Sequence, residues 1–155
     1  MEIETIPVGS SVAEIELSYK PLIKLSRLPL VMASVDAYWL FMQTWDKTKL
    51  LFVEQFKVML LNRANRVIGI CTLSTGSSSN TIVDTKLIFA VALKTNACQI
   101  ILAHNHPSGN LNPSEGDRLI TRRVKEAGLL LDLTLNDHLI ISEDGYYSFS
   151  DEGAI

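Results

Sequence analysis

Cysteines are few in this sequence, and long hydrophobic runs are missing. Cys71 and Cys98 are the only two among 155 residues; they form no C-x-x-C pair and belong to apolar segments. We expect both to be small buried residues rather than metal ligands or disulfide partners, which is usual for cysteine in a reducing cytoplasm. The longest apolar runs, such as residues 87–93, are too short to span a bilayer, and no signal peptide opens the chain. The sequence therefore predicts a cytoplasmic protein with no membrane partner.

An excess of positive charge is also missing. The 14 lysines and arginines are outnumbered by 17 aspartates and glutamates, which gives a net charge of −3. A protein that binds nucleic acid through a general basic field shows the opposite balance, so the charge does not support such a partner. A hydrophobic content of 47% with 20% charged residues is typical of a folded domain. At this length we predict a single domain over residues 1–155, with a leader and edge strand at 1–33 and the core at 34–155.

Strand and helix patterns alternate along the chain. Apolar patterning predicts strands at 14–20, 54–61, 67–73, 99–103, 129–135, 138–142 and 146–149. Helical spacing predicts helices at 34–47, 85–95 and 113–127, with Ser34 and Asp84 as the first two caps and Gly128 ending the third. A stripe expected to face the core from the first helix consists of Val35, Tyr38, Trp39, Met42 and Trp45. This alternation predicts an α/β fold, a three-layer α-β-α sandwich around a mixed sheet.

The most informative segment lies at residues 101–117, where a buried strand is expected to end. His104 and His106 are two positions apart, and residues at that spacing in an extended strand point to the same side. Pro107 cannot donate to a strand ladder and Gly109 tolerates unusual dihedrals, so a loop opens here. Asp117 falls in the first turn of the following helix, where the helix dipole favours a negative charge. Two imidazoles and one carboxylate can therefore converge as a three-ligand zinc site whose fourth position is left for water.

Part of this segment also has a purely structural explanation. Ser114 and Asp117 form the pattern of a capping box, with the serine as N-cap and the aspartate three residues later. Asp117 has two carboxylate oxygens, so capping and metal binding are compatible. An isolated H-x-H pair is common in proteins, whereas H-x-H-x7-S-x-x-D at a strand–loop–helix junction is far more specific.

These residues resemble a known signature. His104, His106, Ser114 and Asp117 match the pattern of the JAMM (JAB/MPN) metalloprotease fold family. The strings HNHPSG, PSEGD and DHLII resemble its bacterial RadC-like branch, historically labelled DNA repair proteins, and the similarity runs from about Glu54 to the C-terminus. The resemblance implies the MPN fold, which is similar to that of the cytidine deaminases. Longer RadC-like proteins carry a helix-hairpin-helix region, and residues 1–53 show no such hairpin.

The resemblance also implies a reaction. It points to a zinc-dependent metallohydrolase of peptide or isopeptide bonds, with one zinc per chain, a metal-activated water and a peptide or protein substrate. It selects Glu54 as the general base, because the family places its catalytic glutamate just ahead of an apolar strand upstream of H-x-H. It assigns Ser114 a hydrogen bond to the developing oxyanion. Asn105 and Ser108, beside the ligands, are candidate substrate contacts, and the polar loop 75–80 is a candidate rim of the cleft.

Two other functions remain open at this point. A zinc nucleobase deaminase is excluded, because it needs H-x-E with P-C-x-x-C. Nucleic-acid binding would depend on the basic residues of the third helix, Arg118, Arg122, Arg123 and Lys125, although such a run is more often a solvated face. A catalytically silent interaction module is the other alternative, and the complete set of ligand-type residues argues against it.

The sequence leaves His138 with two possible roles. It is either a partner that orients a metal ligand or a hydrogen-bonded histidine at the start of a strand. The substrate and the oligomeric state do not follow from the sequence.

Overall fold

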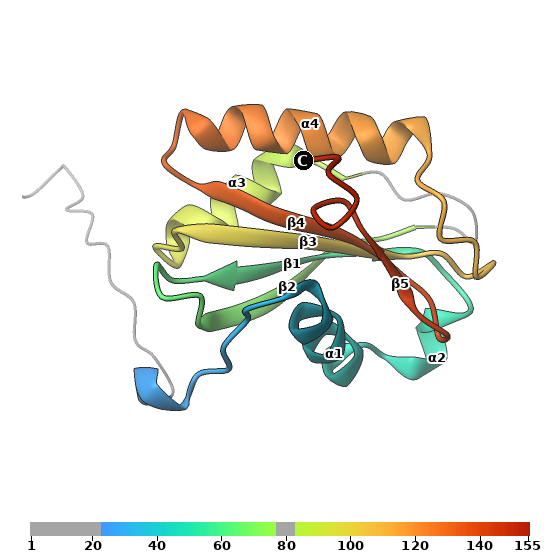
Figure 1. The fold of residues 1–155 in the computed structure, drawn as a ribbon, viewed down its shortest axis with the longest axis horizontal. Coiled ribbons are helices and arrows are strands. Elements are labelled where there is room, and N and C mark those ends of the chain that lie inside the picture. Colours follow the sequence, from blue (N-terminus) through green and yellow to red (C-terminus); the bar gives the residue numbers. More distant parts are fainter. Residues whose placement is uncertain (1–22, 77–82) are drawn as a thin grey trace, which may run out of the picture.

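The computed structural model describes residues 23–76 and 83–155. Within these ranges one mixed sheet has the strand order β2-β1-β3-β4-β5 (Figure 1). Its strands are β1 (Gln55–Leu61), β2 (Val67–Thr75), β3 (Gln99–Asn105), β4 (Thr134–Ile141) and β5 (Tyr146–Ser148). The helices are the short η1 (Leu25–Arg27), α1 (Ser34–Thr44), α2 (Lys47–Leu50), α3 (Thr85–Lys94) and α4 (Glu115–Leu129).

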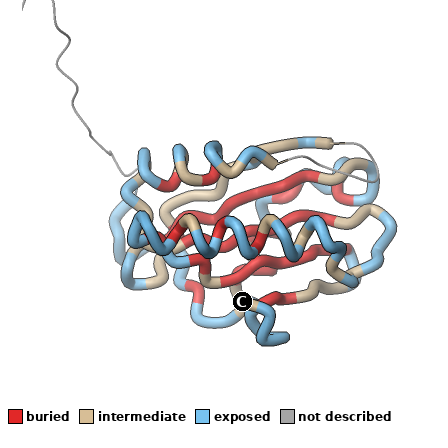
Figure 2. Tube along the Cα trace, turned by 90° about the horizontal axis from the view of Figure 1, so that it is seen from above, coloured by how far each residue is buried: buried red, intermediate tan, exposed pale blue. Residues whose placement is uncertain are grey.

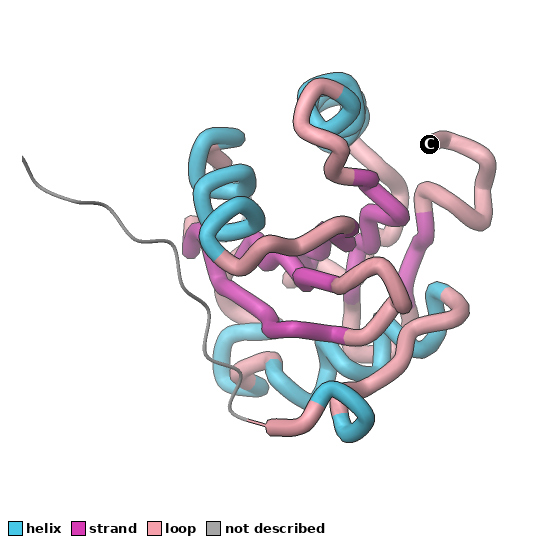
Figure 3. Tube along the Cα trace, turned by 90° about the vertical axis from the view of Figure 1, so that its left-hand side faces the viewer, coloured by secondary structure: helices cyan, strands magenta, loops and turns pink. Residues whose placement is uncertain are grey.

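Helices cover both faces of the sheet. Figures 1 and 3 show α1 and α2 on one side and α3 and α4 on the other, with the strands between them. Each face has its own apolar core: Phe41 and Leu139 belong to the cluster under α1, and Ile88 and Val124 to the cluster under α3 and α4. Figure 2 shows the strands buried beneath helices whose outer faces are exposed. The predicted α/β class and three-layer arrangement are confirmed.

The central strand β3 brings the functional segments together. It pairs antiparallel with β1 and parallel with β4. Its side chains alternate between the two cores, with Leu102 on the α3/α4 side and Ile101 on the α1 side. In the β1–β3 register Phe56 lies opposite His104. Extending that register by two residues places Glu54 opposite His106, at the end of the sheet where the loop opens.

The first predicted helix differs from the observed one. It ends at Thr44, and α2 follows as a separate turn capped by Asp46, whose carboxylate accepts from Thr48 N at 3.0 Å. Ser34 is the first helical residue rather than the N-cap, which is Ala33. Instead of Ser34, Asp36 satisfies the free amides, because its carboxylate accepts from Met32 N and Ala33 N.

The predicted aromatic stripe is only partly correct. Tyr38 and Trp45 are buried, whereas Val35 and Trp39 are exposed. The residues of α1 that face the core are Ala37, Tyr38 and Phe41. Hydrophobic residues occur on more than one side of this helix, so their spacing alone did not distinguish the buried face.

The predicted strand at 129–135 is wrong. Helix α4 continues through Gly128 to Leu129, and the chain then turns before β4, which is one continuous strand. In the turn Asp132 has a positive φ of 51° and Leu133 N donates to Gly128 O at 3.0 Å. The leucine run is apolar enough for a strand, but here the chain must reverse from helix to sheet.

Three further predictions concern segments outside the described ranges, the two cysteines and membrane-spanning helices. The predicted strand 14–20 and most of the loop 75–80 lie outside the described ranges. Cys71 and Cys98 are unpaired and half-buried. Among the described residues, no helix combines the length and apolarity needed to cross a bilayer.

Candidate metal centre

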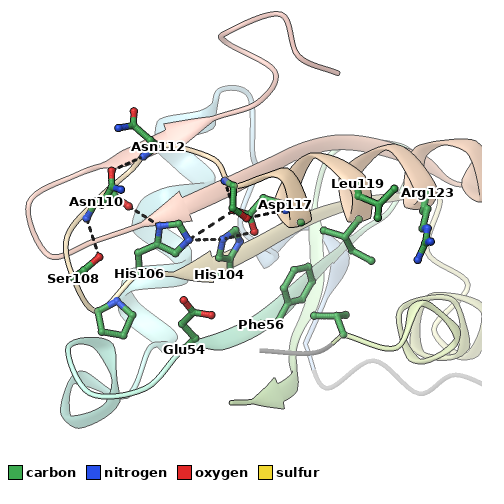
Figure 4. A pocket seen from close by; sticks show the side chains of 15 residues that line it. Glu54, Phe56, His104, His106, Ser108, Asn110, Asn112, Asp117, Leu119 and Arg123 are labelled. Atoms are coloured by element: carbon green, nitrogen blue, oxygen red, sulfur yellow. Dashed lines mark hydrogen bonds and ion pairs between the residues drawn. The ribbon is translucent and has the colours of Figure 1, made fainter. Parts of the chain in front are cut away.

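Three side chains converge at the edge of the sheet where β3 ends and α4 begins. His104 at the end of β3, His106 in the following loop and Asp117 in the first turn of α4 each offer one ligand atom, and these atoms all lie within 4.8 Å of one another. His104 Nε2 is 3.0 Å from His106 Nε2 and 3.1 Å from Asp117 Oδ1. Figure 4 shows the two imidazoles and the carboxylate pointing toward one another. The predicted convergence of these residues is therefore present.

The donor set fits a divalent metal ion. Zinc in proteins is held by imidazole nitrogens and carboxylate oxygens at about 2.0–2.2 Å, which in a tetrahedron separates neighbouring ligand atoms by roughly 3.3–3.6 Å. The observed separations of 3.0 and 3.1 Å, and 3.9 Å between His106 Nε2 and Asp117 Oδ2, lie around that range. Two histidines and one aspartate could thus hold a metal and leave a position open.

The loop after β3 orients His106. Gly109 has a φ of 77°, a conformation that favours glycine, and its amide donates to the His106 carbonyl at 2.9 Å. The turn brings the Asn110 carbonyl within 2.5 Å of His106 Nδ1. Because a carbonyl only accepts, Nδ1 carries the hydrogen and Nε2 is left unprotonated toward His104 and Asp117.

Asp117 serves the helix and the cluster with different oxygens. The capping box is formed as predicted: Asp117 N donates to Ser114 Oγ at 3.2 Å, and Ser114 N donates to Asp117 Oδ2 at 2.7 Å. Oδ1 is left facing His104. Burial alone raises the pKa of Asp117, but the contact with His104 and the hydrogen bonds from Ser114 hold it well below its usual value of 3.8. Asp117 is therefore a carboxylate at neutral pH.

The role left open for His138 is now partly decided. Its Nε2 lies 2.9 Å from His104 Nδ1, so it contacts a predicted ligand directly. The ring is fully buried and stacks on Phe149 at 5.0 Å. Burial, with the neighbouring His104, lowers the pKa of His138 well below its usual value, so the ring is neutral. The string DHLII marked this residue in the sequence but did not show which histidine it would contact.

An open pocket of about 480 Å³ lies over the cluster. Its polar wall includes Ser108 and two asparagines, and Phe56, Leu119 and Arg123 lie on the opposite side (Figure 4). Glu54 lines the same pocket, and Figure 4 shows its carboxylate directed toward the two imidazoles. The roles predicted for Glu54 and Ser108 are compatible with these positions and stay predictions.

Ser114 also lines the pocket, but its hydroxyl is not free. Oγ donates to Asp117 Oδ2 at 2.6 Å, whereas the role predicted for Ser114 needs this hydrogen bond to be donated to an oxyanion. To stabilise an oxyanion, the hydroxyl would have to rotate away from this carboxylate.

Asn105, predicted from the sequence to contact a substrate, does not line the pocket. Its side chain is fully buried and points away from the histidines on either side of it, as strand alternation requires. Oδ1 accepts from Gln55 N at 2.7 Å, and Nδ2 donates to Leu50 O at 2.7 Å and Val53 O at 2.9 Å. Asn105 therefore fastens the backbone on both sides of Glu54 to β3.

The basic residues of α4 do not form a separate site. Arg118, Arg122, Arg123 and Lys125 are exposed, and Arg123 alone among them lines the pocket. An exposed basic row is also what a solvated helix face shows, so nucleic-acid binding stays a prediction.

Comparison with known proteins identifies the family of this chain. A model of the RadC-like JAB domain matches residues 31–154, so the similarity begins before Glu54. Proteins named UPF0758 are 52% identical over 100 residues in Flavobacterium johnsoniae and 44% identical over 102 residues in Thermotoga maritima. These matches cover 64% and 66% of this chain, but only 44% and 46% of the relatives.

A third relative is the UPF0758 protein YeeS of Escherichia coli, which is 42% identical over 102 residues. That match covers 66% of this chain and 69% of YeeS. The chain thus spans less than half the length of the first two relatives. A match over residues 31–154 nevertheless includes the whole described sheet and the metal cluster, and the chain belongs to the RadC-like JAB domain family.

Proposed function

We propose that this protein is a zinc-dependent hydrolase of amide bonds in peptides or proteins, isopeptide bonds included. The observation that carries the proposal is the convergence of His104, His106 and Asp117 beside Glu54 in an open pocket. Membership of the JAB domain family supports metal-dependent hydrolysis in general. The substrate class, the identity of the metal and turnover itself belong to the proposal.

Each residue has a defined task in this scheme. His104 Nε2, His106 Nε2 and one Asp117 oxygen would hold the ion. Zinc, when bound, supplies a water of lowered pKa and polarises a substrate carbonyl. Glu54 takes a proton from the attacking water and delivers it to the leaving amine. Ser114 turns its hydroxyl from Asp117 toward the oxyanion as negative charge develops there.

The Glu54→Gln variant tests this scheme. The amide keeps the size of the side chain but cannot take a proton, so hydrolysis of a mixed-sequence fluorogenic peptide library should fall by about 10²–10⁴-fold. Zinc content, measured by elemental analysis, should stay at one ion per chain. Glu115→Gln, which changes an exposed glutamate at the start of α4, is the matched control and should keep wild-type turnover.

Three results would contradict the proposal in different ways. Wild-type protein that does not retain zinc has no such metal site. Glu54→Gln protein that cleaves as fast as the wild type has a different base. Zinc-loaded wild type that cleaves no peptide or isopeptide bond would favour the silent interaction module.

A further inference from the structure

Both histidines of the cluster must present an unprotonated Nε2, and the fold achieves this in two different ways. For His106 the Asn110 carbonyl is sufficient, because it can only accept. Among the described residues, no carbonyl accepts from His104 Nδ1 in this way. Its Nδ1 lies 2.9 Å from Nε2 of His138, an atom that donates in one tautomer and accepts in the other. The direction of this hydrogen bond therefore depends on the partner of the other ring nitrogen, His138 Nδ1.

The partner of His138 Nδ1 is Thr121. Its Oγ1 lies 2.7 Å from His138 Nδ1 and 2.6 Å from the main-chain carbonyl of Asp117. A hydroxyl has one hydrogen, and the carbonyl can only accept it, so Thr121 donates to Asp117 and accepts from His138 Nδ1–H. The opposite arrangement would leave two oxygens 2.6 Å apart with no hydrogen between them.

We infer that Thr121 and His138 are positioning residues that fix the metal-binding tautomer of His104. The hydrogen of His138 is on Nδ1, so its Nε2 accepts from His104 Nδ1–H. The Nε2 lone pair of His104 is then directed at His106 and Asp117. This inference rests on the metal site of the proposed function, and adds to it a relay that starts at the main chain of one ligand and ends at the ring of another.

The surroundings of the relay leave few alternative hydrogen-bond partners for Thr121 and His138. His138 is fully buried and Thr121 is 3% exposed, so water does not offer alternative partners. The His138 ring lies between Phe149, at 5.0 Å, and Phe56, at 5.5 Å, and its complete burial away from water favours the neutral ring. A neutral ring with both nitrogens bonded has only two possible directions, and Thr121 selects one of them.

A threonine bond to a helix carbonyl does not need a histidine. Thr95, at the end of α3, donates to Val91 O at 2.9 Å in the same manner. Thr95→Val is therefore the matched control: it removes the same kind of helix bond at a place that has no contact with the cluster.

The first measurement is zinc affinity, obtained by competition with a chelating indicator at pH 7.5. Thr121→Val keeps the shape of the side chain but removes the acceptor for His138 Nδ1–H, so zinc should bind about 10–100-fold more weakly. Thr121→Ser restores the hydroxyl and should bind close to the wild type, as should Thr95→Val. If wild type and Thr121→Val bind zinc equally tightly, the relay is refuted while the metal site stands.

The second measurement uses the wild type, so it does not depend on the folding of a variant, and its result for His138 does not depend on zinc. Long-range proton–nitrogen NMR of the wild type at pH 8, metal-free and zinc-loaded, reports which nitrogen of each ring carries hydrogen. We expect the hydrogen of His138 on Nδ1 in both states, and that of His104 on Nδ1 when zinc is present. Hydrogen on Nε2 of His138 would overturn the relay. Wild type without measurable zinc affinity would overturn the proposed function, and the metal-free His138 spectrum would still decide the relay.

Discussion

At the scale of single residues, neighbouring residues where β3 ends have different roles. His104 and His106 face the pocket, and Asn105 between them faces the protein interior, where three backbone groups satisfy its amide. A side chain with all its polar atoms bonded inside the protein is not available to a ligand. Its contribution to function is indirect, through the segment that carries Glu54.

Asn105→Asp tests this role. The new carboxylate can still accept from Gln55 N, but it places an oxygen where Nδ2 donated to two carbonyls. We expect a loss of at least about 1–3 kcal/mol in the free energy of unfolding in urea, the typical cost of a buried unsatisfied polar group, because the cost is higher when the group is charged. Asn112→Asp, on an exposed residue, should change stability little. Equal stability of the two variants would contradict the anchoring role.

The lowered pKa of Asp117 predicts how acid affects the stability of the metal-free protein. Its pKa is lower in the folded state than the usual 3.8, so its ionised form stabilises the fold at pH values above about 4. That contribution is lost as the pH falls below this value toward the folded pKa. In chelator-treated protein, the unfolding free energy of Asp117→Asn should therefore vary less between pH 5 and pH 2 than that of the wild type. Glu115→Gln is the control and should show the same pH dependence of the unfolding free energy as the wild type. If Asp117→Asn also showed the wild-type pH dependence, Asp117 would not make this contribution.

At the scale of elements, α4 is defined at both ends by close contacts. The capping box of Ser114 and Asp117 starts the helix. Near the other end, Gly128 lies against the chain that turns back toward β4: a Cβ built on it would be 2.3 Å from Leu133 O. The two ends fix the position of the helix, and with it that of Asp117 and Thr121 over the sheet.

Gly128→Ala should therefore be strongly destabilising. The added methyl group meets backbone, which cannot rotate away, so we expect a loss of at least about 2 kcal/mol in unfolding free energy, measured by chemical denaturation. Gly116→Ala in the same helix meets only Ser114 Oγ, at 3.5 Å, and should be neutral or stabilising by up to about 1 kcal/mol. A Gly128→Ala protein as stable as Gly116→Ala would show that this turn is not tightly packed.

At the scale of the whole molecule, stability and function share β3. The strand is covered on both faces, and its C-terminal end carries His104. Leu102, two residues before His104, is fully buried against the α3/α4 layer. Leu102 is not a ligand, so loss of its packing should lower the stability of the domain without changing the ligand atoms of the metal cluster.

Leu102→Ala measures that contribution. Removing a fully buried leucine side chain should cost about 2–5 kcal/mol, observed as a lower midpoint of thermal or urea unfolding. Leu130→Ala, on a residue that is 88% exposed, should stay within about 0.5 kcal/mol of the wild type. Similar effects of the two substitutions would contradict the assignment of β3 as the centre of the core.

The sequence by itself determined the features that depend on short-range periodicity. The strand period places His104 and His106 on one side, the capping box starts a helix at Ser114, and the alternation of elements gives the layered α/β class. These patterns are local, so they can be read without knowing which segments meet. The same local rules failed at Val35, Trp39 and residues 129–131, because apolar character does not specify a direction in space.

Tertiary structure alone decided the contacts between distant segments. The β1–β3 pairing, continued by two residues beyond Phe56 and His104, brings Glu54 opposite His106 in the same pocket. Asn105 reaches residues 50 to 55 positions earlier, and His138 contacts His104 across 34 residues. No spacing rule encodes such pairs, since they follow from how two strands and a helix pack on one sheet. Because the orientation of a hydrogen bond depends on every partner in its chain, the relay from Asp117 to His104 exists only in the folded protein.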